Sequence, residues 1–390
     1  MVPVIRRVSR QVAETVLASG WMYLGRFIGL FWAVLLTHEM GIATYGAYAI
    51  AIAISVLITV PLDHYYVVRI LRVNTHTFLG DRSTRLIGGL VLLAVGAILL
   101  QGDHYLSGFA IGKAGGEMAF NAAKSEFIRG GHPARAMGLD TARQLIGFGA
   151  TAAYFLGVDN PTLLGIAAWT LVSFVPFLAW AAWISWGHRP LRPEITARTA
   201  AIIGEAVGGA VYAQADIVML GALASDKSAG YYAYGSLLIW SLAAVGQNYS
   251  YTFTERLREV GGHASAGPAI GPSVRLSLGL GGVVAAVAVV MPFADAPAEL
   301  VWTFAILAVV TVPRTLSSIF TTVLAVQKRD RFRTVVTWIS VAVKFPLLLA
   351  VGHYGGPAAA AAFLVSDLVM TYAYGRAVHR PSAVDEGRAP

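Results

Sequence analysis

Basic side chains stand inside long apolar stretches of this sequence. Arg26 lies near the middle of the first stretch. An arginine at the centre of a bilayer costs about 3 kcal/mol, so its side chain should face other protein or a water-filled cavity. Guanidinium groups bind phosphate oxygens through two parallel hydrogen bonds. We therefore interpret Arg26 either as a ligand of a phosphate group or as an interhelical partner of a carboxylate or backbone carbonyl.

A polar stripe runs along the apolar segment 105–128. Lys113, Glu117, Asn121 and Lys124 follow one another at spacings of four, four and three residues, which places them on one face of a helix. A polar face inside a membrane must avoid lipid. Lys113 and Glu117 either contribute to a wet binding site or simply pair with each other. Lys124 stands near the end of the segment, where it is expected to extend toward the membrane surface.

Two later apolar segments carry further basic residues. Arg314 follows Pro313, which should kink its helix and free a backbone carbonyl. Lys344 either adds to a positively charged cavity or forms a structural ion pair with Asp367. Both interpretations of Lys344 stay open at this point.

Acidic residues in these segments also have more than one interpretation. Asp216 would carry a proton or a sodium ion, or it would pair with Arg26 as a gate between the two halves of the chain. Asp63 stands toward the end of the second apolar run and is expected at the membrane interface.

Transmembrane helices are needed to position these residues. Only 13% of the 390 residues are charged and 56% are hydrophobic, whereas about a quarter of a soluble protein is charged. We predict an all-α polytopic membrane protein with about twelve transmembrane helices. The predicted spans are 16–38, 44–68, 86–102, 105–128, 136–157, 162–186, 199–222, 228–253, 273–292, 298–325, 334–352 and 357–376.

The loops between these spans differ in charge. The gaps after even-numbered spans hold nearly all of the loop arginines, among them Arg72, Arg82, Arg85 and, after the last span, Arg380. Because short basic loops lie in the cytoplasm, both termini are expected there, in a multi-pass protein of the bacterial cytoplasmic (inner) membrane. The net charge of +8 is assigned to these loops, and no nucleic-acid partner is expected.

The two halves of the sequence repeat weakly. Adding 184 to a position takes Gly46 to Gly230 and Tyr48 to Tyr232. Six spans in each half is an even number, so both halves enter the membrane in the same sense, as two parallel repeats. The predicted parts are an N-terminal six-helix lobe over 1–190, a C-terminal six-helix lobe over 191–380 and a disordered cytoplasmic tail over 381–390.

Two stretches of the sequence resemble one group of membrane transporters. GRFIGLFWAVLLTHEMGIATYGAYAIAIA, followed by VPLDHYYVVRILR, resembles the first helical hairpin of O-antigen-type polysaccharide flippases. YAQADIVMLGALASDKSAGYYAYGSLL resembles their seventh and eighth helices. These flippases belong to the multidrug/oligosaccharidyl-lipid/polysaccharide exporter (MOP) superfamily. The resemblance covers about 16–72 and 199–256.

The resemblance implies alternating access by two MATE-like lobes around a central cationic cavity. The implied substrate is a polyprenyl-diphosphate-linked oligosaccharide, moved from the cytoplasmic to the outer leaflet. The expected substrate-binding residues are Arg26, Lys113, Glu117, Arg314 and Lys344. The resemblance places Asp63 near the cavity mouth, so Asp63 and Asp216 are the candidates for ion coupling or gating. Membrane lipids and glycan-assembly proteins are the other expected partners of a monomer.

Two other functions stay open. A cation-coupled multidrug antiporter needs an acidic cavity, whereas four of the five expected substrate-binding residues are basic. A glycan polymerase or ligase needs a large outer loop with arginines, and the predicted outer loops are short and nearly free of arginine. The sequence has no phosphate loop, zinc helix or nucleophile elbow, so we expect neither enzyme activity nor a cofactor. Energy would come from product consumption, a sodium or proton gradient, or the membrane potential.

Overall fold

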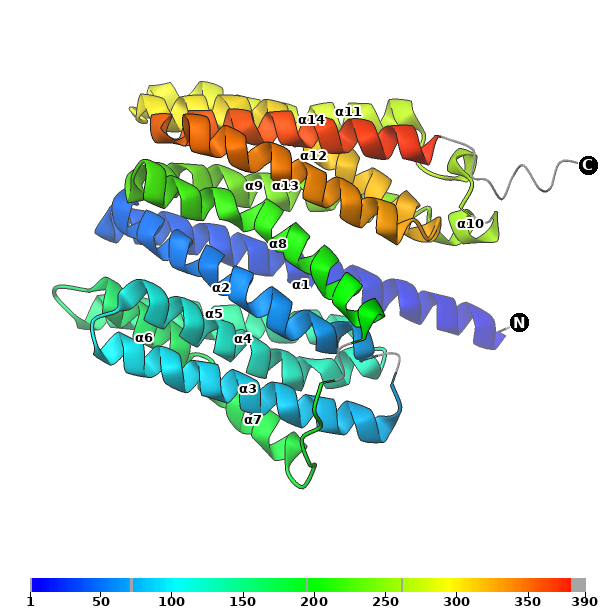
Figure 1. Cartoon of the computed structure of the whole chain (residues 1–390), viewed down its shortest axis with the longest axis horizontal. Coiled ribbons are helices and arrows are strands. Elements are labelled where there is room, and N and C mark those ends of the chain that lie inside the picture. The colour runs from blue at the N-terminus through cyan, green and yellow to red at the C-terminus, as the bar shows by residue number, and fades with distance from the viewer. Residues whose placement is uncertain (1, 71–72, 194–195, 261, 380–390) are drawn as a thin grey trace, which may run out of the picture. The chain divides into compact units, whose positions relative to one another are not determined.

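The computed structural model describes residues 2–70, 73–193, 196–260 and 262–379, and every regular element in these ranges is a helix (Figure 1). The predicted all-α membrane fold is confirmed. The chain forms two compact units, which divide between Ala210 and Val211, within one helix. The predicted tail over 381–390 and the loop residues Arg72 and Arg380 lie outside the described residues.

The first unit begins with two long helices that separate at a glycine. Gly41 has a φ of 84°, a conformation that glycine adopts without steric cost. The sixth predicted span is divided into two helices at Ser173 and Phe174, ahead of Pro176 in the first turn of the second. The helices of this unit are α1 (Val2–Met40), α2 (Ile42–Arg69), α3 (Thr75–Gln101), α4 (Tyr105–Arg129), α5 (Pro133–Gly157), α6 (Leu163–Val172), α7 (Val175–Ser185) and the first part of α8 (Ala197–Leu223).

Glycines bring α3 and α4 into backbone contact. A Cβ atom at Gly96 would lie 2.3 Å from Cα of Gly112, and one at Gly115 would lie 2.4 Å from the backbone nitrogen of Leu93. Small residues at such crossings are the usual basis of close helix packing in membranes. The ribbons of α3 and α4 accordingly run side by side in Figure 1.

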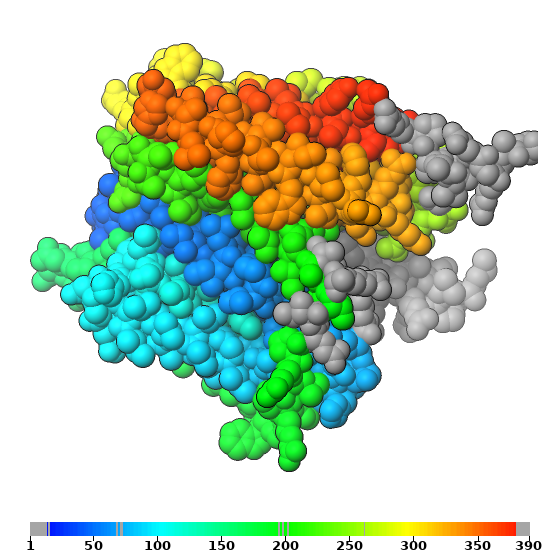
Figure 2. Space-filling model, viewed as in Figure 1, coloured from blue at the N-terminus to red at the C-terminus, as the bar shows by residue number. Residues whose placement is uncertain are grey.

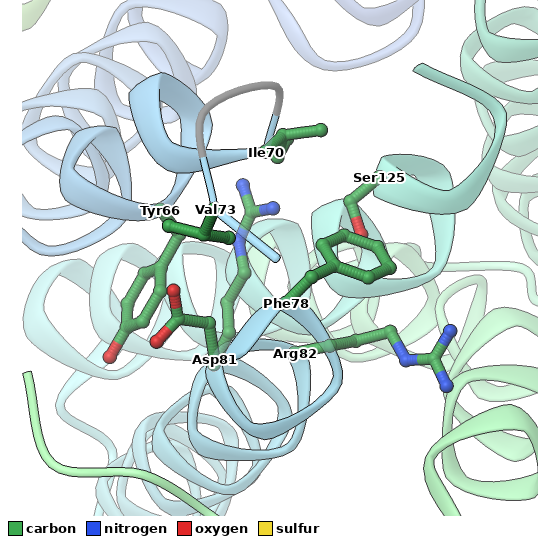
Figure 3. Close-up of a pocket in the computed structure, with 8 residues that line it drawn as sticks. Tyr66, Ile70, Val73, Phe78, Asp81, Arg82 and Ser125 are labelled. Carbon is green, nitrogen blue, oxygen red and sulfur yellow. The ribbon is translucent and has the colours of Figure 1, made fainter. Parts of the chain in front are cut away.

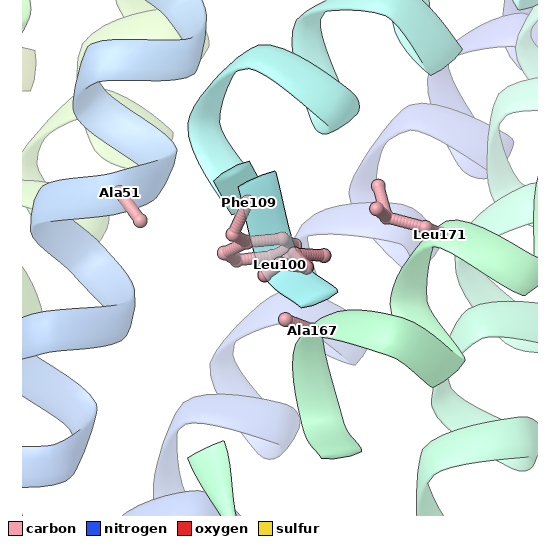
Figure 4. Close-up of a cluster of buried hydrophobic side chains, with 5 residues drawn as sticks. All are labelled: Ala51, Leu100, Phe109, Ala167 and Leu171. Atoms are coloured by element: carbon pink, nitrogen blue, oxygen red, sulfur yellow. The ribbon is translucent and has the colours of Figure 1, made fainter. Parts of the chain in front are cut away.

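An apolar cluster packs α4 against α2 and α6 as well as against α3. Phe109 of α4 packs with a residue of α2, one of α3 and two of α6 (Figure 4). The five buried members are Ala51, Leu100, Phe109, Ala167 and Leu171. Because α4 also contacts α5 and α7, it lies inside the unit, where protein rather than lipid surrounds most of its surface.

The second unit is built around α12. This helix packs against α9, α11 and α14, and α13 and α14 lie side by side in the space-filling view (Figure 2). The helices of this unit are the rest of α8, α9 (Asp226–Tyr251), α10 (Thr254–Glu259), α11 (Ile270–Val290), α12 (Ala298–Val326), α13 (Asp330–Val351) and α14 (Gly356–Val378). The first residues of α2 and α9, Ile42 and Asp226, are related by the 184-residue offset of the repeat.

Nine helical segments in the described part of the chain are long and apolar enough to cross a membrane, so the chain is a multi-pass membrane protein. The helices α4, α5 and α9 occupy predicted spans but are not among those nine. Charged side chains make α4 and α5 less apolar, and these two helices carry the first cluster described below.

The third helix begins earlier than predicted. The predicted span started at residue 86 and left Arg82 and Arg85 in a loop. Instead, α3 begins at Thr75, because Oδ1 of Asn74 accepts a hydrogen bond of 2.9 Å from the backbone N–H of Thr77 and caps the helix. Arg82 and Arg85 therefore lie inside a helix, and both are buried.

Candidate functional site

Three charged side chains of the first unit meet on α4 and α5. Nζ of Lys113 lies 2.7 Å from Oε1 of Glu117, and a guanidinium nitrogen of Arg143 lies 3.1 Å from the same oxygen. The side chains of Lys113, Glu117 and Arg143 expose 13%, 21% and 14% of their surfaces. Two positive charges thus share one carboxylate, which leaves a positive excess at a partly accessible position.

Aromatic rings make cation–π contacts with Lys113 and Arg143. The guanidinium carbon of Arg143 lies 5.0 Å from the ring centroid of Phe120 and 5.1 Å from that of Phe174. Nζ of Lys113 lies 5.7 Å from the Phe174 centroid. Each such contact is worth about 0.5 to 2 kcal/mol, depending on solvation. Nε of Arg143 is buried and has no acceptor within the described structure, so this guanidinium has hydrogen-bonding capacity left.

Arg26 lies on α1, which packs against α5. A Cβ atom at Gly25 would lie 3.0 Å from Nε2 of Gln144, so α1 and α5 are in contact at these two positions. Arg26 follows Gly25 and Arg143 precedes Gln144, so the two arginines stand at the same level of neighbouring helices. Arg26 is partly buried. The structure therefore brings Lys113 and Glu117 together with Arg143, and it places Arg26 on the neighbouring helix at the level of Arg143.

A second ion pair joins the same two helices. Nζ of Lys124 lies 2.9 Å from Oδ2 of Asp140. Asp140 holds the side chain of Lys124 against α5, and the extension of Lys124 toward the membrane surface stays a prediction. This pair has one charge of each sign, unlike the cluster around Glu117.

A third contact of the first unit involves Asp63. Arg85 donates from two guanidinium nitrogens to the two carboxylate oxygens of Asp63, and from a third to the carbonyl oxygen of Asn121 at 2.9 Å. Nδ2 of Asn121 also donates to Asp63, at 2.9 Å. Asp63 is buried among α2, α3 and α4, and its predicted position at the membrane interface stays a prediction.

A small cavity lies close to Asp63, where α2 ends and α3 begins. Its volume is about 10 Å³, about one water molecule, which is too small for a substrate. Figure 3 shows the side chain of Arg82 pointing away from Asp81, and Arg82 makes an ion pair of 3.2 Å with Glu126. The lining residues are Tyr66, Ile70, Val73, Phe78, Asp81, Arg82, Arg85 and Ser125.

The second unit holds a buried network around Asp216. Nζ of Lys344 lies 2.6 Å from Oδ2 of Asp216 and donates to the backbone carbonyl of Tyr212 at 2.8 Å. The hydroxyl of Tyr232 donates to the same carboxylate oxygen, and the backbone N–H of Ile217 donates to Oδ1 at 3.1 Å. Asp216 is therefore held by α8, α9 and α13 together.

Asp367 is held by a different cation. A guanidinium nitrogen of Arg314 lies 3.2 Å from Oδ1 of Asp367, and the hydroxyl of Tyr212 donates to that same oxygen. The interpretation of Lys344 as the partner of Asp367 is wrong, because Lys344 pairs with Asp216 instead. Oδ2 of Asp367 is fully buried and has no donor in the described structure.

The predicted substrate residues thus fall into two groups of different charge. In the first unit, Lys113 and Arg143 share Glu117, and positive charge is in excess. In the second unit, the positive charges of Arg314 and Lys344 are each matched by a carboxylate. The roles of all five residues as substrate ligands, and of Asp63 and Asp216 in coupling or gating, stay predictions.

Sequence reasoning did not identify Arg143. The residue stands within the predicted span 136–157, three positions after Asp140, and the two lie on neighbouring turns of one helix. A charged pair at this spacing inside a spanning segment was the available signal.

No protein-family model and no curated protein sequence matches the chain. Solved structures do match it. The lipid II flippase MurJ, in an inward closed conformation, aligns over 95% of this chain and 89% of its own, with a TM-score of 0.67 and 12% identity. The MATE multidrug transporter DinF-BH aligns over 95% of each chain, with a TM-score of 0.63 and 14% identity.

A third similar structure is an inward-facing multidrug resistance MATE family transporter of the MOP superfamily. It aligns over 97% of this chain and 100% of its own, with a TM-score of 0.61 and 14% identity. The chain therefore has the fold of MOP superfamily transporters, a fold that is common to a lipid flippase and to multidrug transporters.

Proposed function

We propose that this protein is a flippase that moves a polyprenyl-diphosphate-linked oligosaccharide from the cytoplasmic to the outer leaflet, for surface polysaccharide or cell-wall glycan assembly. The observation that carries the proposal is the sharing of Glu117 between Lys113 and Arg143. A partly accessible positive excess inside a membrane protein attracts an anionic headgroup and repels a cationic drug.

The chemistry of these side chains suits a diphosphate. A guanidinium offers a planar fork of donors to phosphate oxygens, and an ammonium adds a point charge. Arg143 supplies the fork and Lys113 the point charge, while Arg26 stands at the same level on the adjacent helix. The isoprenoid tail would remain in lipid, so only the headgroup has to enter the protein.

Transport by this protein would proceed by alternating access in the bacterial cytoplasmic membrane, with both termini in the cytoplasm and with a monomer as the working unit. We propose that a sodium or proton gradient or the membrane potential drives it. Moving one charge through 100 mV is worth about 2.3 kcal/mol, enough to bias a transport cycle. Arg314 would act as a further ligand, whereas the enclosed ion pairs of Asp63 with Arg85 and of Asp216 with Lys344 would stabilise the fold.

One observation favours a second function, a cation-coupled multidrug antiporter. Oδ2 of Asp367 is buried without a donor, and a carboxylate oxygen in that position suits a proton or a metal cation. The similar MATE structures are multidrug transporters by name.

A reconstitution experiment separates the two functions. The purified protein is placed in liposomes with a fluorescent polyprenyl-diphosphate-linked disaccharide, and the fraction accessible to an external quencher is followed over time. In parallel, cells that produce the protein are tested for extrusion of a cationic dye. We expect rapid movement of the lipid-linked sugar and no dye extrusion. Dye extrusion without movement of the sugar would overturn the flippase proposal in favour of the antiporter.

A further inference from the structure

Glu117 lies between two cations of the first unit. Nζ of Lys113 and a guanidinium nitrogen of Arg143 approach one and the same oxygen, Oε1, at 2.7 and 3.1 Å. We propose that Glu117 is an internal competitor of the transported anion: it holds both cations in the empty protein, and an incoming phosphate group displaces it. The inference rests on the proposed function only for the identity of that anion.

The geometry around Oε1 is the one that a phosphate oxygen would find. Two donors on different helices converge on this single atom, one from α4 and one from α5. A phosphate oxygen bears a comparable negative charge and accepts several such hydrogen bonds. The incoming group can therefore replace Glu117 donor by donor, while Nε of Arg143 still has no acceptor and offers a further contact.

Exposure distinguishes this carboxylate from those of the second unit. Glu117 exposes 21% of its side chain, whereas Asp216 and its partner Lys344 each expose 1%. The exposed part of Glu117 gives an anion access to this carboxylate and leaves room for the freed carboxylate to turn away. Asp216 has no such exit, so its ion pair is a fixed part of the fold.

An internal competitor gives the site a useful affinity. Lys113 and Arg143 without any counter-ion would be two partly desolvated positive charges close together, which is unfavourable. Glu117 removes this cost in the empty protein and lowers the affinity for an external anion by the same interaction. A transporter needs binding that is strong enough for entry and weak enough for release.

A purely structural role for Glu117 makes a different prediction. Lys124 and Asp140 form a pair between the same helices, with similar exposures of 17% and 23%. Removal of either acidic charge adds one positive charge to the α4–α5 pair. Of these two carboxylates, Glu117 contacts two cations and Asp140 contacts one. Asp140→Asn is therefore the matched control for the effect of an added positive charge alone.

The test measures binding of inorganic pyrophosphate to the full-length protein in phosphatidylcholine nanodiscs by isothermal titration calorimetry. We expect Glu117→Gln to bind pyrophosphate about tenfold more tightly than the wild type, a difference of about 1.4 kcal/mol. We expect Asp140→Asn to change the affinity less than about twofold. Adding Lys113→Ala to Glu117→Gln should abolish the gain. Glu117→Ala also removes the competing carboxylate, and it replaces Glu117→Gln in the titration if that variant does not fold.

Three results would overturn the inference. These are equal or weaker binding by both Glu117 variants, no measurable binding by any protein, and an equal gain from Asp140→Asn. Transport is scored separately in the liposome assay. A gain in pyrophosphate affinity without any movement of lipid-linked sugar would leave the inference standing and remove the proposed function. Movement of the lipid-linked sugar without a gain in pyrophosphate affinity would leave the proposed function standing and remove the inference.

A final comparison identifies the source of the phosphate group. The titrations are repeated in nanodiscs that contain phosphatidylglycerol. If this lipid weakens pyrophosphate binding to Glu117→Gln more than to the wild type, bilayer headgroups also reach the cations that Glu117 covers. If both proteins respond equally, the site selects the diphosphate over a membrane phosphodiester.

Discussion

Lys344 on α13 lies 2.6 Å from Asp216 on α8, and each of these side chains exposes 1% of its surface. Nζ of Lys344 also lies 4.2 Å from the ring centroid of Phe363 and 4.8 Å from that of Tyr212. A pair that is so well enclosed cannot exchange its carboxylate for water. In this structure it therefore joins α8 and α13 as an enclosed pair.

Removing one member of this pair should strongly destabilise the protein. Asp216→Asn leaves the ammonium of Lys344 buried without its counter-ion, and such a loss costs about 3 to 5 kcal/mol. We expect a clearly lower midpoint of thermal unfolding in detergent. The double variant Asp216→Leu with Lys344→Met should recover much of the loss, since apolar residues can replace a buried pair. Wild-type stability in the single variant would show that Lys344 does not depend on Asp216.

The clamp between Arg85 and Asp63 is expected to act on stability rather than on transport. Arg85→Lys keeps the charge but cannot reach both carboxylate oxygens and the carbonyl of Asn121 together. We expect a loss of about 1.5 to 3 kcal/mol in the free energy of unfolding, with an unchanged flipping rate per folded molecule. Arg192→Lys, at an exposed loop position, is the control. A lower flipping rate at unchanged stability would instead support Asp63 as a gate.

The helices and one charged contact could be predicted from the sequence. Long apolar runs located the spans, because a bilayer fixes the length of a helix that crosses it. The spacing of Lys113 and Glu117 predicted their contact, because residues four positions apart meet on any helix. Capping of α3 by Asn74 was also a readable signal, and it would have placed Arg82 and Arg85 inside the helix.

Ion-pair partners that lie on different helices could not be predicted in the same way. Sequence reasoning offered Asp367 as the partner of Lys344 and missed Asp216, because spacing along the chain does not rank partners on different helices. The choice depends on where α13 lies relative to α8 and α14, which is set by side-chain volumes along whole helices. Arg143 joined the site for the same reason: its contact with Glu117 exists only because α4 and α5 are neighbours.

The close contact of α3 and α4 provides a test of how α4 is held. Gly96→Leu places a large side chain where a Cβ atom alone would lie 2.3 Å from Cα of Gly112. We expect the helices to separate and the free energy of unfolding to fall by about 3 kcal/mol or more, measured by thermal unfolding in detergent. Gly149→Leu is the control, because a Cβ atom there has no neighbour within 4 Å. Equal unfolding midpoints for the two variants would contradict this packing.

Substitutions of Arg26 test whether this residue binds the transported anion in addition to Lys113 and Arg143. Arg26→Lys keeps the positive charge and loses the planar fork, whereas Arg26→Ala loses both. If Arg26 contacts the diphosphate, the flipping rate in liposomes should fall about tenfold in the lysine variant and further in the alanine variant, because the lost hydrogen bonds are charge-assisted. Arg192→Ala should flip at the wild-type rate. Wild-type rates in both Arg26 variants would remove Arg26 from the mechanism, and its cost inside the membrane would then be explained by helix packing alone.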